Sequence, residues 1–253
     1  MIHSLPIIEL KNVSLKIPIL SSESRNLKRR ILRSTTGGLF LKSRQKLEVV
    51  ALKCLNLSFS RGEKVALIGH NGSGKTSFLR LISGIYKPSQ GNLDVRVNVY
   101  PMLQKSFLTS PELSGLEAVK AHYLFLNRKL KGFEDYLDEI IEFSGLGAYI
   151  AMPLKSYSDG MSARLMFSIL TSCAHDCLAL DEGLGTGDAS FFNKAQKRME
   201  SFVNSAGSLF LASHSEELLM KFCTRGLVFN HGEVVYDGIL KDALNYYGEG
   251  CDK

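Results

Sequence analysis

The sequence predicts an α/β fold in which a sheet of mostly parallel strands is covered by helices. Short apolar runs alternate with helical patterns along the chain, which is the arrangement that builds such a sheet. A glycine-rich loop stands between one of these runs and a helical pattern. With 45% hydrophobic and 22% charged residues, the 253-residue chain can form a large packed core, which excludes wholesale disorder.

The first third of the chain is expected to form three strands and a helix. Residues 7–17 and 49–59 show strand-like alternation, and Pro18 ends the first of these runs. The short apolar run VALI indicates a buried strand over 64–68. A helix is expected over 75–83, because Gly84 and Pro88 follow it as stop signals.

The rest of the chain is expected to be helical first and then to alternate. Residues 112–175 are mostly helical by pattern, with breaks at Gly132, Gly145 and Pro153. Three short apolar strands follow, separated by helical stretches, over 177–180, 208–213 and 226–230. No internal repeat is visible, so the sequence does not predict a tandem of two similar units.

The positive charge is concentrated in one segment. Residues 25–46 carry eight Lys and Arg and no acid, so the net charge of +6 for the chain leaves −2 for the remainder. A basic arm on a near-neutral body indicates one adhesive surface rather than nucleic-acid binding. Three interpretations of this segment are open: it binds anionic lipid headgroups, it binds an acidic partner, or it is a solvated loop. Leu27, Ile31 and Leu32 lie between the basic residues at helical spacing, which favours a short amphipathic helix.

The chain is expected to be a soluble protein of a reducing compartment. Its five cysteines are scattered and odd in number, unlike a disulfide framework. No apolar run approaches the roughly 18–20 residues that span a bilayer. The first residues do not have the pattern of a signal peptide.

A phosphate-binding loop is predicted at residues 69–76, GHNGSGKT. This run fits G-x-x-x-x-G-K-[ST], and it follows an expected strand and opens an expected helix. The glycines let backbone amides approach phosphate oxygens at a helix N-terminus. Lys75 is expected to reach the terminal phosphates and the Thr76 hydroxyl to bind Mg²⁺.

A second motif places two acids at the end of a buried strand. Residues 177–182 read CLALDE, about a hundred residues after the phosphate loop. Asp181 is expected to hold Mg²⁺, and Glu182 to polarise the attacking water. A base at this position favours a hydrolase over a kinase.

Three further features complete a set that resembles the ATP-binding cassette of ABC transporters. They are YSDGM at 157–161 as the signature motif, Asp188 after Gly187 as the end of the D-loop, and His214 as the switch histidine. The resemblance implies a P-loop NTPase fold: a RecA-like mixed-sheet core, an antiparallel β subdomain, and a helical subdomain over about 105–165. The whole chain, 1–253, would be one ATP-binding domain carrying a basic insertion over 18–48.

The resemblance also implies a composite site in a homodimer that binds ATP and Mg²⁺. The nucleotide contacts of one chain would be Gly69, Asn71, Gly72, Ser73, Gly74, Lys75, Thr76, Ser77 and Asp188. The other chain would supply Ser158, Gly160 and Met161. Glu182, His214 and Lys75 would be catalytic, and Thr76, Asp181 and Gln104 would serve the metal.

The likeness narrows to the ATPase subunits of bacterial polysaccharide exporters, above all those of O-antigen and related lipopolysaccharides. It rests on the strings STTGG (34–38), ALKCLNLSF (51–59), EFSGLGAYIAMPLKSYSDGM (142–161) and DEGLGTGD (181–188). It implies an ATPase on the cytoplasmic face of the inner membrane, partnered by a separate transmembrane permease and not by nucleic acid. The alternatives are export of teichoic acid, capsule or another glycan, a soluble non-transport ATPase, and an importer, against which the tyrosine-led signature argues.

The chain departs from the general cassette pattern at Asp159, at Ser162, where other polar residues are usual, and at Val49 and Val50. Asp159 stands where the signature usually has a small residue. Val49 and Val50 occupy the position of the aromatic that stacks on adenine in many cassettes, so base selectivity is expected to be shallow unless Phe40 or Tyr86 reaches the base. His231, in an expected turn, is interpreted as structural.

Overall fold

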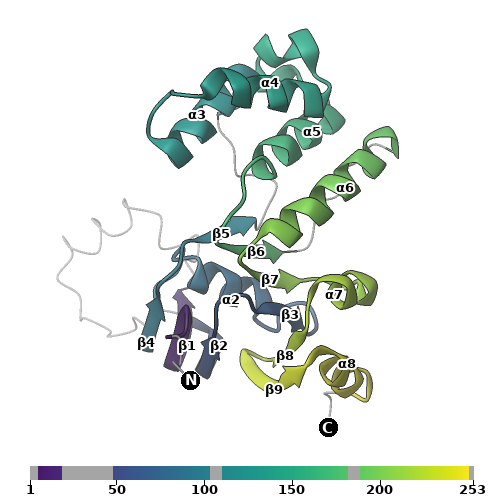
Figure 1. The fold of residues 1–253 in the computed structure, drawn as a ribbon. Coiled ribbons are helices and arrows are strands. Elements are labelled where there is room, and N and C mark those ends of the chain that lie inside the picture. Colours follow the sequence, from purple (N-terminus) through teal and green to yellow (C-terminus); the bar gives the residue numbers. More distant parts are fainter. Residues whose placement is uncertain (1–4, 19–47, 103–109, 182–188, 251–253) are drawn as a thin grey trace, which may run out of the picture.

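The computed structural model describes residues 5–18, 48–102, 110–181 and 189–250 (Figure 1). These residues form a six-stranded sheet, a three-stranded antiparallel sheet, and helices on both sides of the larger sheet. None of the described helices is long and apolar enough to cross a membrane.

The six-stranded sheet has the order β5-β6-β7-β3-β8-β9 and is parallel except for its last strand. Its short apolar runs are buried on both faces, as expected of a parallel sheet between helices. The carboxyl ends of the parallel strands therefore meet at one edge, and the predicted phosphate loop, Asp181 and His214 lie at or just after three of these ends. The strands span Val99–Met102 (β5), Cys177–Asp181 (β6), Ser208–Ala212 (β7), Lys64–Ile68 (β3), Arg225–Asn230 (β8) and Glu233–Ile239 (β9).

The smaller sheet packs against one face of the larger one through helix α2 (Lys75–Ile82). Its order is β2-β1-β4, with bounds Glu48–Phe59, Ile8–Pro18 and Gln90–Val95. Four fully buried phenylalanines join the layers, with ring centroids 4.9–6.1 Å apart: Phe59 of β2, Phe78 of α2, Phe210 of β7 and Phe229 of β8. This core fixes β2 next to the start of α2.

The other face of the large sheet is covered by α6 (Ala189–Ser205), α7 (Glu216–Phe222) and α8 (Leu240–Gly248). Alternate residues of each strand supply the two cores, so Leu178 and Leu180 face these helices while Ala179 faces α2. Helix α7 begins after Ser215, whose hydroxyl accepts a hydrogen bond from the Leu218 amide and caps the helix.

Helices α3 (Gly115–Asn127), α4 (Phe133–Ser144) and α5 (Asp159–Leu170) form a helical unit with its own apolar core. In Figure 1 they lie together at the end of the molecule opposite β9 and α8. Ser114 and Glu117 make a capping box at the start of α3, and Gly132 and Gly145 flank α4 in left-handed conformations. Short 3₁₀ turns, Gly147–Ala151 and Leu154–Ser156, connect α4 to α5.

Three strands were not predicted from the sequence. The exposed strand β4, QGNLDV, has little apolar pattern, and β9 alternates only between exposed and half-buried positions. Strand β5, VYPM, contains Pro101 and lies at the edge of its sheet, where a missing amide is tolerated. The other expected elements lie within one or two residues of their predicted bounds.

Candidate nucleotide site

The phosphate loop turns sharply out of β3 and leads into α2. Gly69 has a φ of 147°, and a Cβ atom there would lie 2.4 Å from the carbonyl oxygen of Phe229. Only glycine fits such a position beside β8. No side chain caps the N-terminus of α2, so the first amides of the helix are available for an anion, as in other phosphate loops.

The side chains of α2 bring a positive charge and a hydroxyl group to this loop. Lys75 Nζ donates hydrogen bonds to the carbonyl oxygens of Gly69 and His70. Thr76 Oγ1 donates to Asp181 Oδ2 across 2.6 Å, although the two residues lie 105 positions apart in the sequence. A hydroxyl and a carboxylate in contact beside a phosphate loop fit the oxygen ligands that Mg²⁺ prefers.

His214 lies at the same edge of the sheet, two residues beyond the end of β7. Its Nε2 is 3.1 Å from Oδ1 of Asn71, a residue of the phosphate loop. The histidine that the resemblance assigned to the γ-phosphate therefore lies beside the predicted phosphate loop.

A pocket of about 540 Å³ joins these residues; we call it the phosphate-loop pocket. Its lining includes the predicted site residues Asn71, Gly72, Ser73, Gly74, Lys75, Thr76, Ser77, Asp181 and His214. The remaining lining residues are Ile17, Val49, Val50, Ala51, Lys53, Ala212, His231 and Gly232. The volume of this pocket lies in the range of small-molecule sites.

Comparison with known proteins identifies the architecture. The sequence pattern of the ABC transporter family matches residues 52–185, more than half of the chain. The O-antigen export system ATP-binding protein RfbE of Yersinia enterocolitica is 36% identical over 228 residues, which are 90% of this chain and 95% of RfbE. The chain belongs to the ABC transporter family of ATP-binding proteins. The family resemblance and the fold class predicted from the motifs are both confirmed, and members of this family are ATPases.

Other relatives of this ABC ATPase include proteins of two export systems. RfbB of Klebsiella pneumoniae, of an O-antigen export system, is 32% identical over 87% of this chain and 88% of its own length. TagH of Bacillus cereus, a teichoic acids export protein, is 32% identical over 95% of the chain, which spans 42% of TagH. Among solved structures, the dimeric cassette MJ0796 with ADP and Pi has a TM-score of 0.67 at 18% identity, covering 92% of this chain and 98% of MJ0796.

The signature residues of the cassette lie on the helical unit, outside the phosphate-loop pocket. Ser158 caps α5, and its Oγ accepts a hydrogen bond from the Met161 amide across 3.2 Å. Asp159 is in the first turn of α5, where a negative charge favours the helix. Residues 71–77, Asp181 and His214 thus line one pocket within a single chain. Ser158, Gly160 and Met161 of the same chain do not line it.

Three predicted site residues lie outside the described part of the chain. These are Gln104, Glu182 and Asp188. Their neighbours are described: β5 ends at Met102, and β6 ends at Asp181 beside Thr76. The expected basic insertion also falls almost wholly outside the described residues.

A buried polar chain between the cassette core and the helical unit was not found from the sequence. His122 of α3 bridges Tyr100 of β5 and Tyr136 of α4, with Nε2 2.8 Å from one hydroxyl and Nδ1 3.0 Å from the other. The Ser172 hydroxyl donates a further hydrogen bond to the Tyr136 hydroxyl. The His175 ring stacks on Tyr100 at a centroid distance of 3.8 Å. The sequence does contain one feature that could have indicated this network, a histidine on the buried face of the helical run AVKAHYLF.

Burial determines the protonation of these hydrogen-bonded side chains. It lowers the pKa of His122 to about 4, with a smaller contribution from His175, and raises the pKa of Tyr136 to about 12. The pKa of Tyr100 is also raised, again mainly by burial. At neutral pH His122 is therefore an uncharged imidazole with one N–H, between two protonated tyrosines.

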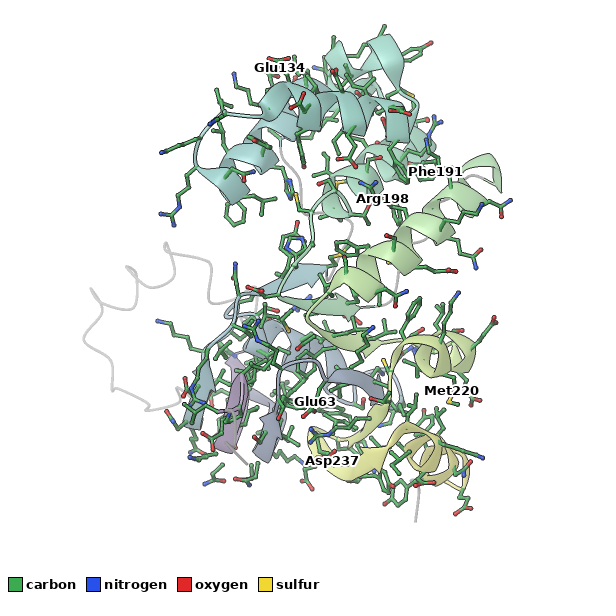
Figure 2. The ribbon with its side chains drawn as sticks, in the orientation of Figure 1. Glu63, Glu134, Phe191, Arg198, Met220 and Asp237 are labelled. Carbon is green, nitrogen blue, oxygen red and sulfur yellow. The ribbon has the colours of Figure 1, made fainter. Side chains whose placement is uncertain are left out.

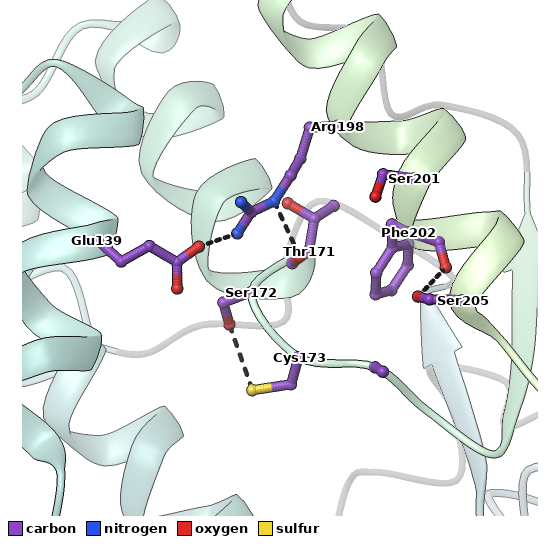
Figure 3. Close-up of a pocket in the computed structure, with 9 residues that line it drawn as sticks. Glu139, Thr171, Ser172, Cys173, Arg198, Ser201, Phe202 and Ser205 are labelled. Atoms are coloured by element: carbon purple, nitrogen blue, oxygen red, sulfur yellow. Dashed lines mark hydrogen bonds and ion pairs between the residues drawn. The ribbon is translucent and has the colours of Figure 1, made fainter.

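A smaller pocket of about 210 Å³ lies where α6 meets the helical unit (Figure 3). Arg198 of α6 crosses it, donating from Nε to the Thr171 carbonyl oxygen across 3.1 Å and pairing with Glu139 of α4. Nearby, Phe191 packs edge-on against Phe167 of α5 at a centroid distance of 5.9 Å. Phe191 and Arg198 both lie on the side of α6 that faces the helical unit (Figure 2).

Proposed function

We propose that this chain is the ATP-hydrolysing subunit of an exporter that moves a lipid-linked polysaccharide, similar to O-antigen, across the inner membrane. The observation that carries the proposal is the contact between Thr76 and Asp181 in a pocket that also contains Lys75 and His214. The O-antigen and teichoic acid export relatives support the cargo class.

The residues of the pocket divide the work of phosphate transfer. The loop amides and Lys75 bind the β- and γ-phosphates, and His214 contacts the γ-phosphate from the neighbouring strand end. Thr76 and Asp181 would hold Mg²⁺, with Gln104 as a further contact, and the metal would neutralise charge on the transferred phosphoryl oxygens. Glu182 accepts a proton from the attacking water.

We propose that two copies form the working ATPase. The signature residues Ser158, Gly160 and Met161 lie away from the pocket of their own chain, which supports their use on a partner's ATP. Asp188 would line the interface between the two copies. Closure around two ATP molecules and reopening after hydrolysis would be passed to a separate transmembrane permease at the cytoplasmic face of the membrane.

The cargo is tested in cells from which this chain has been deleted. We expect surface polysaccharide to be lost and its lipid-linked form to accumulate inside, where extraction and mass spectrometry identify the glycan. A Lys241→Ala copy, altered at an exposed residue of α8, should restore export, whereas a Lys75→Ala copy should not. Intact surface glycan in the deletion strain would contradict the proposal, and accumulation of a teichoic acid precursor would favour that alternative cargo.

The basic segment, residues 25–46, is expected to dock on the membrane or on the permease. Eight positive charges favour an anionic surface by about 1 kcal/mol per residue near it. Replacing all eight with Gln should leave ATP hydrolysis mostly intact and abolish sedimentation with anionic vesicles and export. The control replaces Lys197 of α6 and Lys241 of α8, both exposed, with Gln. Unchanged export in the eightfold variant would refute the assignment.

Base selectivity is expected to be shallow. Val49 and Val50 line the pocket with 50% and 41% of their surface exposed and offer only apolar contact. Most affinity should come from the phosphates and Mg²⁺, so ATP and GTP should differ in Kd by about tenfold or less, which is 1.4 kcal/mol. Competition binding measures the ratio, and Val50→Tyr should tighten ATP binding. A preference above about a hundredfold would mean that a residue reads the edge of the base.

A further inference from the structure

The turn between β8 and β9 holds one histidine against the phosphate loop. His231 has a φ of 46°, in the left-handed region, and the next residue, Gly232, has a φ of 85°. The Gly232 amide donates to the Ser73 carbonyl oxygen, and the Gly232 carbonyl accepts from the Lys53 amide, both across 2.8 Å. The backbone of the turn is therefore fixed between the phosphate loop and β2.

Close packing reinforces this position. A Cβ atom at Gly232 would lie 2.8 Å from the carbonyl oxygen of Ala51, so the turn approaches β2 as closely as glycine allows. The ring of His231 lies 5.2 Å from the ring of His70, centroid to centroid. His70 is itself held, with Nδ1 2.9 Å from the Asn71 carbonyl oxygen. The His231 ring thus projects from a rigid backbone next to a second fixed ring.

His231 lines the same pocket as the predicted phosphate-binding residues. Lys75, Thr76 and Asp181 define the phosphate end, so the base of a bound nucleotide must extend toward Ile17, Val49 and Val50. Among the described residues that line the pocket, the rings are those of His214 and His231. His214 contacts the phosphate loop through Asn71, which leaves His231, whose neighbour Gly232 packs against Ala51 of β2, as the other planar group of the lining.

The other aromatic candidates do not take this place. Tyr86 packs against the core behind α2, where its hydroxyl accepts a hydrogen bond from Arg80, and it does not line the pocket. Phe40 lies outside the described residues.

We propose that His231 stacks on the adenine ring of ATP and replaces the strand aromatic that Val49 and Val50 lack. This binding role is additional to the structural role expected for His231 from the sequence. Stacking on a planar side chain tolerates every base, because each base presents a π-face. The proposal therefore agrees with shallow discrimination between ATP and GTP, and it rests on the proposed ATP site.

The test compares ring removal with ring replacement. His231→Asn removes the ring and keeps a residue that tolerates a positive φ. We expect its Kd for ATP to rise about fivefold or more, the lower range for loss of one base-stacking side chain. The Kd for inorganic tripolyphosphate should stay within about twofold, since the phosphate end is unchanged. His231→Tyr should bind ATP at least as tightly as the wild type.

The outcomes distinguish stacking by His231 from ATP binding at the site as a whole. Unchanged ATP binding in His231→Asn, or equal weakening of ATP and tripolyphosphate, would overturn stacking by His231. Lys75→Ala, measured in parallel, should weaken both ligands. If it weakens neither, the proposed ATP site itself is wrong, whereas loss in Lys75→Ala with no loss in His231→Asn rejects the stacking alone. Thermal unfolding of each variant checks that the chain still folds.

Discussion

Replacing Glu182 with Gln is expected to leave ATP binding intact and to slow hydrolysis by about two orders of magnitude or more, as when a positioned base is lost. Glu182 directly follows Asp181, whose carboxylate accepts the hydrogen bond from Thr76 at the end of β6. Glutamine has nearly the same shape but cannot take the proton of the attacking water. ATP would stay bound, so a dimer should accumulate in its presence, measured by phosphate release and by size-exclusion chromatography.

Two control variants separate this effect from damage to the site. Glu217→Gln, at an exposed position of α7, should hydrolyse ATP at the wild-type rate. Lys75→Ala should instead fail at binding, because it removes the charge nearest the terminal phosphates. A Glu182→Gln enzyme that turns over at close to the wild-type rate would show that another group is the base.

Lowering the pH from 7 to 5 is expected to reduce the free energy of unfolding by about 2 kcal/mol through His122 alone. The pKa of this imidazole falls to about 4 in the folded chain, so between pH 6.5 and 4 the unfolded chain binds the extra proton and the folded chain does not. The contribution of His122 to stability is thus complete above its unfolded pKa and is lost as the pH falls. Tyr100, Tyr136 and His175 face the imidazole, and none of them offers a negative charge at these pH values that would hold the proton.

Urea unfolding of the wild type and of His122→Gln at both pH values measures this contribution. Glutamine can bridge the two tyrosine hydroxyls but does not titrate, so the variant should lose less stability on acidification. Other groups titrate in both proteins and cancel in the comparison. Equal loss of stability in the two proteins would show that His122 is not the group responsible.

The phosphate end of the site was predictable because its chemistry is local in the sequence. Residues 69–76 and the acid at 181 belong to short motifs attached to apolar strands, and parallel pairing of β3 with β7, and of β7 with β6, brings the strand ends together. The predicted role of Glu182 rests on the motif alone, since the described chain stops at Asp181 before it resumes at 189.

The base end and the polar chain were harder to predict because they depend on tertiary packing. His231 reaches the pocket only because the β8–β9 turn is fixed against Ser73 and Lys53, which lie far away in the sequence. His122 faces Tyr100 and Tyr136 across three elements, one of which, β5, had no recognisable strand pattern. Such contacts leave no periodic signal in a single sequence.

Arg198 restricts how the helical unit can move relative to the large sheet. The helical unit is joined to the rest of the chain by its covalent connections and by the hydrogen bond between His122 and Tyr100 of β5. It is also joined to α6 through Arg198 and through Lys194, whose Nζ donates to the carbonyl oxygens of Glu142 and Phe143. A rotation of α3–α5 relative to the large sheet must therefore break the contacts with α6 or carry α6 with it, and must break the bond to Tyr100 or move β5. Because α6 begins at residue 189, a displacement that carries α6 would also move the point at which the described chain resumes after Asp181.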